Sequence, residues 1–143
     1  MKFALTMDAS DPVPLARFWM VALDYVEAAP PAGWDSWAAW LDDQGVPPDE
    51  RGDGATIADP AGIGPSITFL KVPEQKSAKN RLHLDLQASG GRHVPADVRL
   101  QRITAVVDSL TAIGARTLHE HVRGDDLDHV VLADPEGNEF CVV

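Results

Sequence analysis

Polar side chains that can do chemistry stand at every second position of two short apolar segments. His83, Asp85 and Gln87 alternate with leucines, and Glu139 and Cys141 alternate with apolar residues at the end of the sequence. Because successive side chains of a strand point to opposite faces, each set is expected to share one face of a sheet. An imidazole beside carboxylates suits general acid–base chemistry on a proton next to a carbonyl group, although structural histidines use the same partners.

Cys141 is the only cysteine, which excludes an intrachain disulfide and fits a reducing cytoplasm. Beside His83 its thiol would be a candidate nucleophile. On a buried C-terminal strand it would instead be a small core side chain, the interpretation that we favour.

Thr6 and Asp8 alternate with Phe3, Leu5 and Met7, the pattern of a half-buried strand near the N-terminus. They are predicted to join the polar face that carries His83, Asp85, Gln87, Glu139 and Cys141. Three carboxylates and one imidazole would then face one concavity, together with a hydroxyl, an amide and a thiol.

Tryptophans recur at helical spacing in the first half of the sequence. Trp34, Trp37, Trp40 and Leu41 predict a short amphipathic helix, opened by Asp35 and closed by Gly45, within an insert over residues 34–54. Trp37 and Trp40 either pack this helix onto the domain or form an aromatic wall beside a ligand pocket. In the second case they would attract cationic or planar organic molecules.

Two further groups of basic side chains leave alternatives open. His119 and His121 share one face of a predicted strand, where they either chelate a metal or face solvent, and we favour solvent. His129 starts another strand and stays undecided. Lys79 and Arg81 either belong to a solvated linker or clamp an anionic ligand.

The composition excludes several classes of partner. The 143 residues include 22 Asp and Glu against 12 Lys and Arg, a formal net charge of −10. Such a charge repels nucleic acid and anionic membranes. No run approaches the roughly 20 apolar residues of a membrane span, and Asp8 interrupts the N-terminal segment before a signal-peptide core forms. We expect one cytoplasmic domain over residues 1–143.

An internal repeat organises the sequence. Residues 56–62 recur as residues 131–137, each an apolar run that ends in Asp-Pro-x-Gly and precedes a second apolar run, as in a hairpin. Each half also begins with an alternating strand and an amphipathic helix. The helical stripes are Leu15, Phe18, Trp19, Ala22 and Leu23 in the first half, and Leu100, Ile103, Val106, Val107, Leu110 and Ile113 in the second, with Asp97 as N-cap and Gly114 as stop.

These paired modules resemble the vicinal oxygen chelate superfamily, which includes glyoxalase I, extradiol dioxygenases, and fosfomycin- and bleomycin-resistance proteins. Residues 72–86 and 134–142 resemble its bacterial glyoxalase-like domain branch in particular. The resemblance implies an α+β fold of two βαβββ modules, about residues 1–73 and 80–143. Their curved mixed sheet would surround a U-shaped cavity, with the helices on the outer face. It also implies a homodimer.

Enzymes of this superfamily hold a divalent metal through one ligand on the first and last strand of each module. Transferred to this sequence, the four positions are Ala4, Thr68 or Phe69, His83 and Cys141. Alanine and phenylalanine offer no donor, so no metal or other cofactor is expected. If a metal does bind, its ligands would be His83, Cys141 and Glu139, with Asp85 as a substitute.

Two functions follow from this sequence. The first is binding of a small organic molecule, cationic or aromatic, by a protein with a degenerate metal site. Its binding residues would be Thr6, Asp8, His83, Asp85, Gln87, Glu139, Cys141, Trp37 and Trp40. The alternative is a metal-dependent lyase, isomerase or dioxygenase in which His83 and Glu139 are catalytic.

Overall fold

The computed structural model describes residues 2–143, which form two units, Met1–Gln75 and Lys76–Val143. Each unit is a βαβββ-like module built on one mixed four-stranded sheet. The strand orders are β1-β4-β3-β2 in unit 1 and β5-β8-β7-β6 in unit 2. The first strand of each unit pairs in parallel with the last, and the other pairs are antiparallel. The predicted α+β fold of two repeated modules is therefore confirmed.

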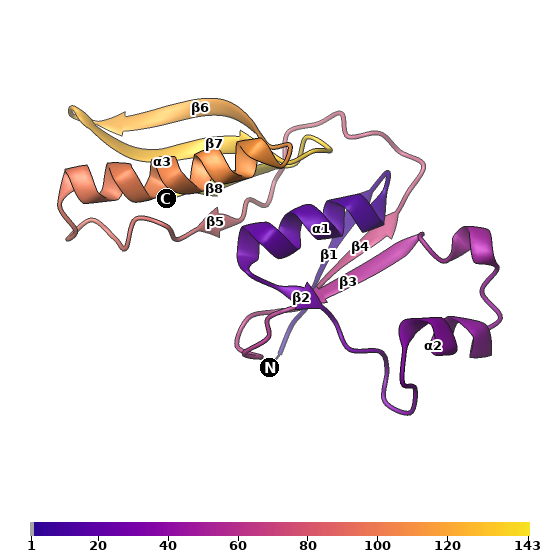
Figure 1. Ribbon diagram of the computed structural model, residues 1–143. Helices are drawn as coiled ribbons and strands as arrows, with labels where there is room; N and C mark the ends of the chain where they lie inside the picture. The colour runs from indigo at the N-terminus through magenta and orange to yellow at the C-terminus, as the bar shows by residue number, and fades with distance from the viewer. Residues whose placement is uncertain (1) are drawn as a thin grey trace. The chain divides into compact units, whose positions relative to one another are not determined.

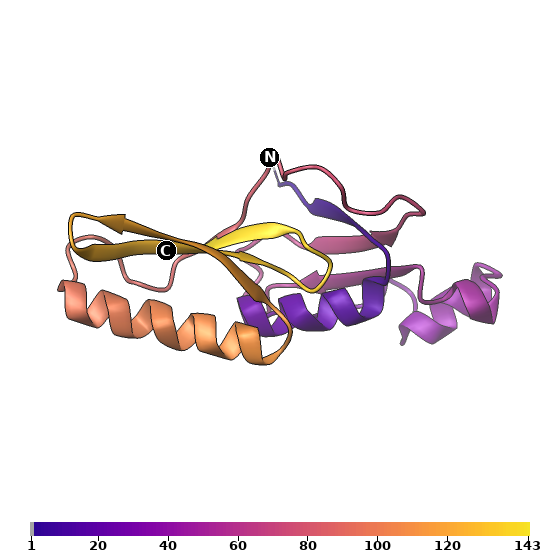
Figure 2. The same cartoon turned by 90° about the horizontal axis from the view of Figure 1, so that it is seen from above.

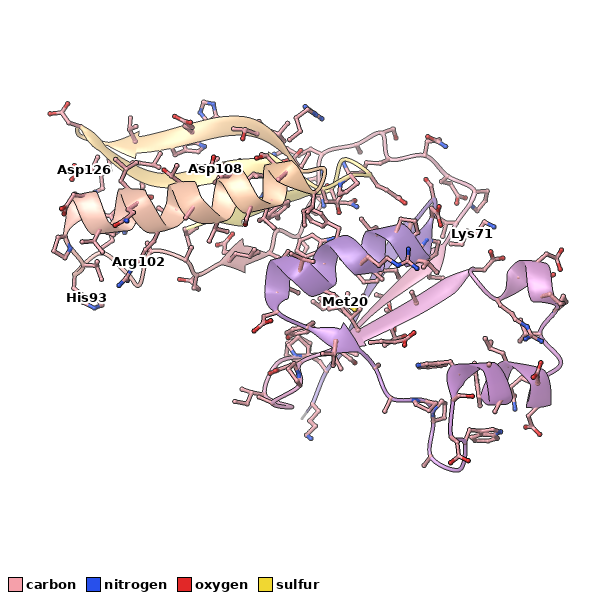
Figure 3. All side chains as sticks on the ribbon, viewed as in Figure 1. Met20, Lys71, His93, Arg102, Asp108 and Asp126 are labelled. Atoms are coloured by element: carbon pink, nitrogen blue, oxygen red, sulfur yellow. The ribbon has the colours of Figure 1, made fainter. Side chains whose placement is uncertain are left out.

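Unit 1 packs one helix on one face of its sheet (Figure 1). Its elements are β1 (Leu5–Ala9), α1 (Pro12–Leu23), β2 (Val26–Glu27), α2 (Trp37–Asp43), the 3-10 helix η1 (Pro48–Glu50), β3 (Gly54–Ala58) and β4 (Ile67–Lys71). The core consists of the buried side chains Leu15, Phe18, Trp19, Ile57, Ile67 and Phe69. The apolar stripe predicted for α1 thus supplies the helix side of the core. Figure 3 shows Met20 on the side of α1 that faces the sheet.

The Trp-bearing helix differs from its prediction at its start. Helix α2 begins at Trp37, and the N-cap is Ser36, whose hydroxyl accepts the N–H of Ala39 at 3.1 Å. The predicted opening at Asp35 is therefore wrong by one residue, and Trp34 lies before the helix. Both Ser and Asp cap helices well, so local sequence does not decide between adjacent candidates. No residue of α2 is buried, and Figure 1 shows α2 set apart from the strands of its unit.

Unit 2 repeats the arrangement with a longer helix. Its elements are β5 (Asp85–Leu86), α3 (Ala96–Ala112), β6 (Arg116–Arg123), β7 (Asp126–Ala133) and β8 (Glu139–Val142). Figure 2 shows α3 along one face of this sheet. The core consists of Ile103, Leu110, Val130, Leu132, Phe140 and Val142, all at most 3% exposed. In residues 2–143 no helix is long and apolar enough to cross a bilayer.

Three expectations for unit 2 need correction. Helix α3 is capped at Pro95, not at Asp97, which lies in its first turn, where a carboxylate still favours the helix dipole. Leu100 and Ile113 are 48% and 41% exposed, because only the middle of the predicted stripe faces the sheet. The strand expected over residues 82–87 has regular pairing only at Asp85–Leu86.

The repeated Asp-Pro-x-Gly motif forms the same turn in both hairpins. Asp59 Oδ1 accepts the N–H of Ala61 at 2.8 Å, and Asp134 Oδ1 accepts the N–H of Glu136 at 3.0 Å. The glycine that closes each turn has a positive φ, +67° in the first and +89° in the second. A side chain disfavours that conformation, which explains the glycine at this place in both copies.

Candidate functional site

The unit-2 sheet brings five of the predicted residues to the face opposite α3. Asp85 of β5 is level with Cys141 of β8. Glu139 alternates with Cys141 on β8. His83 Nε2 lies 3.6 Å from Glu139 Oε2, and Gln87 lines one pocket with Asp85 and Cys141, so the five side chains lie close together. The intervening residues of β8, Phe140 and Val142, are buried in the core. Alternation along β8 therefore separates its core side, with Phe140 and Val142, from the side that carries Glu139 and Cys141.

Glu139 is the most strongly engaged carboxylate on this face. Lys79 Nζ forms an ion pair with Glu139 Oε2, and His83 Nε2 lies 3.6 Å from the same oxygen. The hydrogen bond from Lys79 lowers the pKa of Glu139, and the charges of Lys79 and His83 lower it further. Lys79 therefore offsets a carboxylate of its own unit.

Cys141 is only 8% exposed. Burial, and then the negative charge of Asp85 with its hydrogen bond to the thiol, raise the pKa of Cys141 to about 11. The thiol is thus protonated at neutral pH. This state fits the interpretation of Cys141 as a small buried side chain better than that of a nucleophile, which requires the thiolate.

A pocket of about 580 Å³ opens beside this face within unit 2. Its lining residues are Asp85, Gln87, Ser89, Gly91, Arg92, Arg99, Asp128, His129, Cys141 and Val143. We call it the β5–β8 pocket. Asp85, Gln87 and Cys141 had been predicted as binding residues, whereas Ser89, Arg92, Arg99 and Asp128 had not. Their segments become neighbours only through the pairing of β5, β8 and β7.

Asp128 and His129 form a charged cluster at the wall of the β5–β8 pocket. His129 Nδ1 lies 3.1 Å from Asp128 Oδ2, and Arg92 Nε donates to Asp128 Oδ1 at 3.2 Å. The hydrogen bond with His129, and next the charge of Arg92, lower the pKa of Asp128, against the opposing effect of burial. The adjacent Asp-His pair was visible in the sequence, but nothing local linked it to Arg92.

Three imidazoles line up across β6 and β7. The ring centroids of His119 and His121 are 4.4 Å apart, and those of His121 and His129 are 4.3 Å apart and stacked. Desolvation, and then the charges of His129 and His119, lower the pKa of His121. All residues of β6 are exposed, in line with the solvent-facing interpretation of His119 and His121.

Thr6 and Asp8 lie on β1 in unit 1, on the face opposite α1. Thr6 is level with Thr68 of β4, which is level with Thr56 of β3. The hydroxyl oxygens of Thr56 and Thr68 are 3.1 Å apart. This part of the face therefore presents hydroxyl groups rather than a metal ligand.

A second pocket, of about 570 Å³, lies within unit 1 between α1, α2 and β3. It is lined by Val13, Ala16, Arg17, Met20, Glu27, Trp37, Trp40, Leu41, Glu50, Arg51, Gly54, Ala55, Thr56, Ile57 and Thr68. We call it the tryptophan pocket. Trp37 and Trp40 are half-buried, and their rings meet edge to face, with centroids 5.6 Å apart and planes at 88°.

Polar contacts anchor Trp37 and the end of α2. Trp37 Nε1 donates to the carbonyl oxygen of Ala28 at 2.6 Å. Arg51, which also lines the pocket, forms an ion pair with Asp42 of α2 and donates to the carbonyl oxygen of Val46 at 3.3 Å. These contacts hold the aromatic wall while leaving the pocket in front of it open.

The donors at the four expected metal positions do not fit a divalent ion. Ala4 has no donor, Phe69 is fully buried, and the hydroxyl of Thr68 is hydrogen-bonded to that of Thr56. Glu139, the expected substitute ligand, is already paired with Lys79. Cys141 would have to lose its proton against a raised pKa. Within residues 2–143 there is no group of three or more His, Cys, Asp or Glu side chains arranged to hold a metal.

Comparison with known proteins identifies related folds. The family model described as "Glyoxalase-like domain" matches residues 4–143. A glyoxalase/bleomycin resistance protein/dioxygenase family enzyme from Burkholderia phytofirmans aligns with a TM-score of 0.58 at 14% identity, over 97% of this chain and 94% of its own. The fosfomycin resistance protein FosX from Listeria monocytogenes aligns with a TM-score of 0.60 at 11% identity, over 99% and 89%. No curated protein matches significantly. At these identities the structural matches bear on the fold alone.

Proposed function

The chain belongs to the glyoxalase-like domain family of the vicinal oxygen chelate superfamily, and on that premise we propose that it binds a small organic cation with an aromatic part, without a metal. The ligand would occupy the tryptophan pocket. The observation that carries this proposal is that the perpendicular rings of Trp37 and Trp40 line a pocket. The helix that bears them, α2, has no buried residue.

Aromatic rings in this position suit a flat ligand. Perpendicular rings offer one face and one edge to a third ring, the arrangement that aromatic groups prefer. Met20 and Leu41 add apolar surface to the same pocket. A volume of about 570 Å³ lies within the usual range for small-molecule sites.

The charge of unit 1 supports a cationic ligand. Residues 1–75 contain 12 Asp and Glu against 4 Lys and Arg, a formal charge of −8 out of −10 for the whole sequence. Glu27 and Glu50 line the pocket together with Arg17 and Arg51. The charge of Arg51 is offset by Asp42, so two carboxylates stand against the one remaining arginine. Such a field raises the local concentration of cations, and the indole faces attract them at short range.

The experiment uses three naphthalene probes of nearly equal size: 1-naphthylmethylammonium, the neutral 1-naphthylmethanol and the anionic 1-naphthylacetate. Titration calorimetry should give the tightest binding for the cation, with the affinity falling as salt is added. Trp40→Leu should lower the affinity for the cationic probe by roughly tenfold. Trp34→Leu is the matched control, because Trp34 does not line the pocket. The proposal would be contradicted if the cationic probe and the alcohol bound with equal affinity, or if no probe bound. An equal loss of affinity for the cation in Trp40→Leu and Trp34→Leu would also contradict it.

A metal-dependent lyase, isomerase or dioxygenase is the second candidate, and the His83–Glu139 pair is the observation that favours it. Its test is the metal content of protein incubated with Zn, Ni, Co, Mn or Fe(II) and then desalted. We expect only trace metal, the same in wild type and His83→Ala. Near-stoichiometric metal that is lost in His83→Ala would establish the metalloenzyme instead.

A further inference from the structure

We propose that the β5–β8 pocket binds a different ligand, an elongated zwitterion whose cationic end meets Asp85 and whose anionic end meets Arg99. This site is separate from the tryptophan pocket, and the inference does not depend on the function proposed for that pocket.

Arg99 supplies an unmatched positive charge. The residue lies in the first turn of α3, is only 8% exposed and lines the pocket. Its Nη2 donates to the carbonyl oxygen of Leu127 at 3.0 Å, and in the described part of the chain it forms no ion pair. Buried arginines are normally paired with a carboxylate, since burial removes the charge from water. A ligand carboxylate would supply that missing partner.

Asp85 supplies the opposite charge on another wall. Its carboxylate is exposed, and its neighbour is the protonated thiol of Cys141. Within residues 2–143 it too forms no ion pair. The other charged pair of the pocket is matched internally, because Arg92 bonds Asp128. Asp85 therefore remains available to a cationic group of a ligand, and Arg99 to an anionic group.

The strand register sets the length of the ligand. Strands β5 and β7 lie on either side of β8, so the strand of Asp85 and the strand of Leu127 are roughly 10 Å apart, measured across the sheet. Asp85 and Val131 are both level with Cys141, and Leu127 lies four residues before Val131, roughly 13 Å along the strand. The side chains shorten this path, but an α-amino acid, with one carbon between its charges, is too short. The ligand must separate its charges by a chain of several bonds.

The wall between the two charges suits such a chain. Gln87 and Ser89 line the pocket with polar groups, and Val143 and the neutral Cys141 give it apolar surface. The volume of about 580 Å³ is ample for a linear molecule of some ten heavy atoms. An ω-amino acid combines the two charges with a flexible apolar chain.

The test compares four probes on the full chain by titration calorimetry: 8-aminooctanoate, its isomer 2-aminooctanoate, octylamine and octanoate. We expect 8-aminooctanoate to bind at least tenfold more tightly than each of the others. Arg99→Met should abolish its advantage over octylamine, and Asp85→Asn its advantage over octanoate. Trp40→Leu should leave the affinity for 8-aminooctanoate unchanged, which separates this site from the tryptophan pocket.

The comparison of the four probes on wild-type protein decides the matter even if Arg99→Met fails to fold. Equal binding of 8-aminooctanoate and octylamine would overturn the inference, as would a preference for 2-aminooctanoate or no binding of any probe. If Arg99→Met folds, as judged by circular dichroism, and keeps the wild-type preference, Arg99 is only a structural tie to β7. None of these results bears on binding of naphthalene probes to the tryptophan pocket.

Discussion

Lys79 and Glu139 form an ion pair that joins the segment before β5 to the first residue of β8. The same carboxylate lies 3.6 Å from His83 Nε2. A glutamate that would serve as a metal ligand or a catalytic base must be free to meet its substrate. Here Glu139 instead faces cations of its own unit, which argues for a structural role.

The pH dependence of stability should reveal this ion pair. The pKa of Glu139 is lowered in the folded state, so its contribution to stability is complete above the ordinary carboxyl pKa and is lost as the pH falls through the lowered value. Glu139→Gln should therefore reduce the free energy of unfolding at pH 7 but have little effect at pH 2.5, in urea titrations. Glu74→Gln, at an exposed position, is the control. An equal loss for Glu139→Gln at both pH values would mean that charge plays no part.

Asp134 should contribute more to stability than most polar residues. Its side chain is 3% exposed and accepts the backbone N–H groups of Glu136 and Asn138. Asp134→Ala leaves partly buried donors without their acceptor, at a cost of about 1–3 kcal/mol. Asp59→Ala alters the corresponding, less buried turn of unit 1 and should cost less. Urea denaturation of both variants measures the difference, and a larger loss for Asp59→Ala would show that burial does not set it.

Cys141 should react slowly with alkylating reagents. A pKa raised from 9.0 to about 11 reduces the thiolate at neutral pH by roughly 100-fold. Mass spectrometry of protein treated with iodoacetamide at pH 7.5 should show little modification in the folded state and full modification in 6 M guanidinium. Rapid alkylation of folded protein would instead favour the nucleophile interpretation.

The two sides of α3 should respond differently to truncation. Leu110 is 2% exposed, and Leu110→Ala should destabilise the protein by about 2–5 kcal/mol because it leaves a cavity. Leu100 is 48% exposed in the same helix, and Leu100→Ala should cost about 0.5 kcal/mol or less. Thermal and urea unfolding of the two variants check this. A similar loss of stability in the two variants would mean that Leu100 is buried in solution, in a contact with another molecule.

Local sequence determined most of the fold of each unit. Alternation indicated which side chains of β8 share a face, and the repeated Asp-Pro-x-Gly motif marked both hairpin turns. These features depend on residues within a few positions of one another, so they can be read without knowledge of the fold. Helix ends were less certain, since Asp35 and Ser36 both make good caps and only the backbone hydrogen bond to Ser36 decides between them.

The tertiary structure alone decided which side chains meet. The sequence predicts one binding site that includes Trp37, Trp40, Asp85 and Cys141. In the structure the tryptophans line a pocket of unit 1, and the other two residues line a pocket of unit 2. The sequence around Arg99 predicts only a helix and no role in binding. Its buried position near β7 nevertheless gives the β5–β8 pocket a positive charge. Composition and alternation carry the chemistry of single residues. Their neighbours depend on strand pairing between distant segments, which no local pattern encodes.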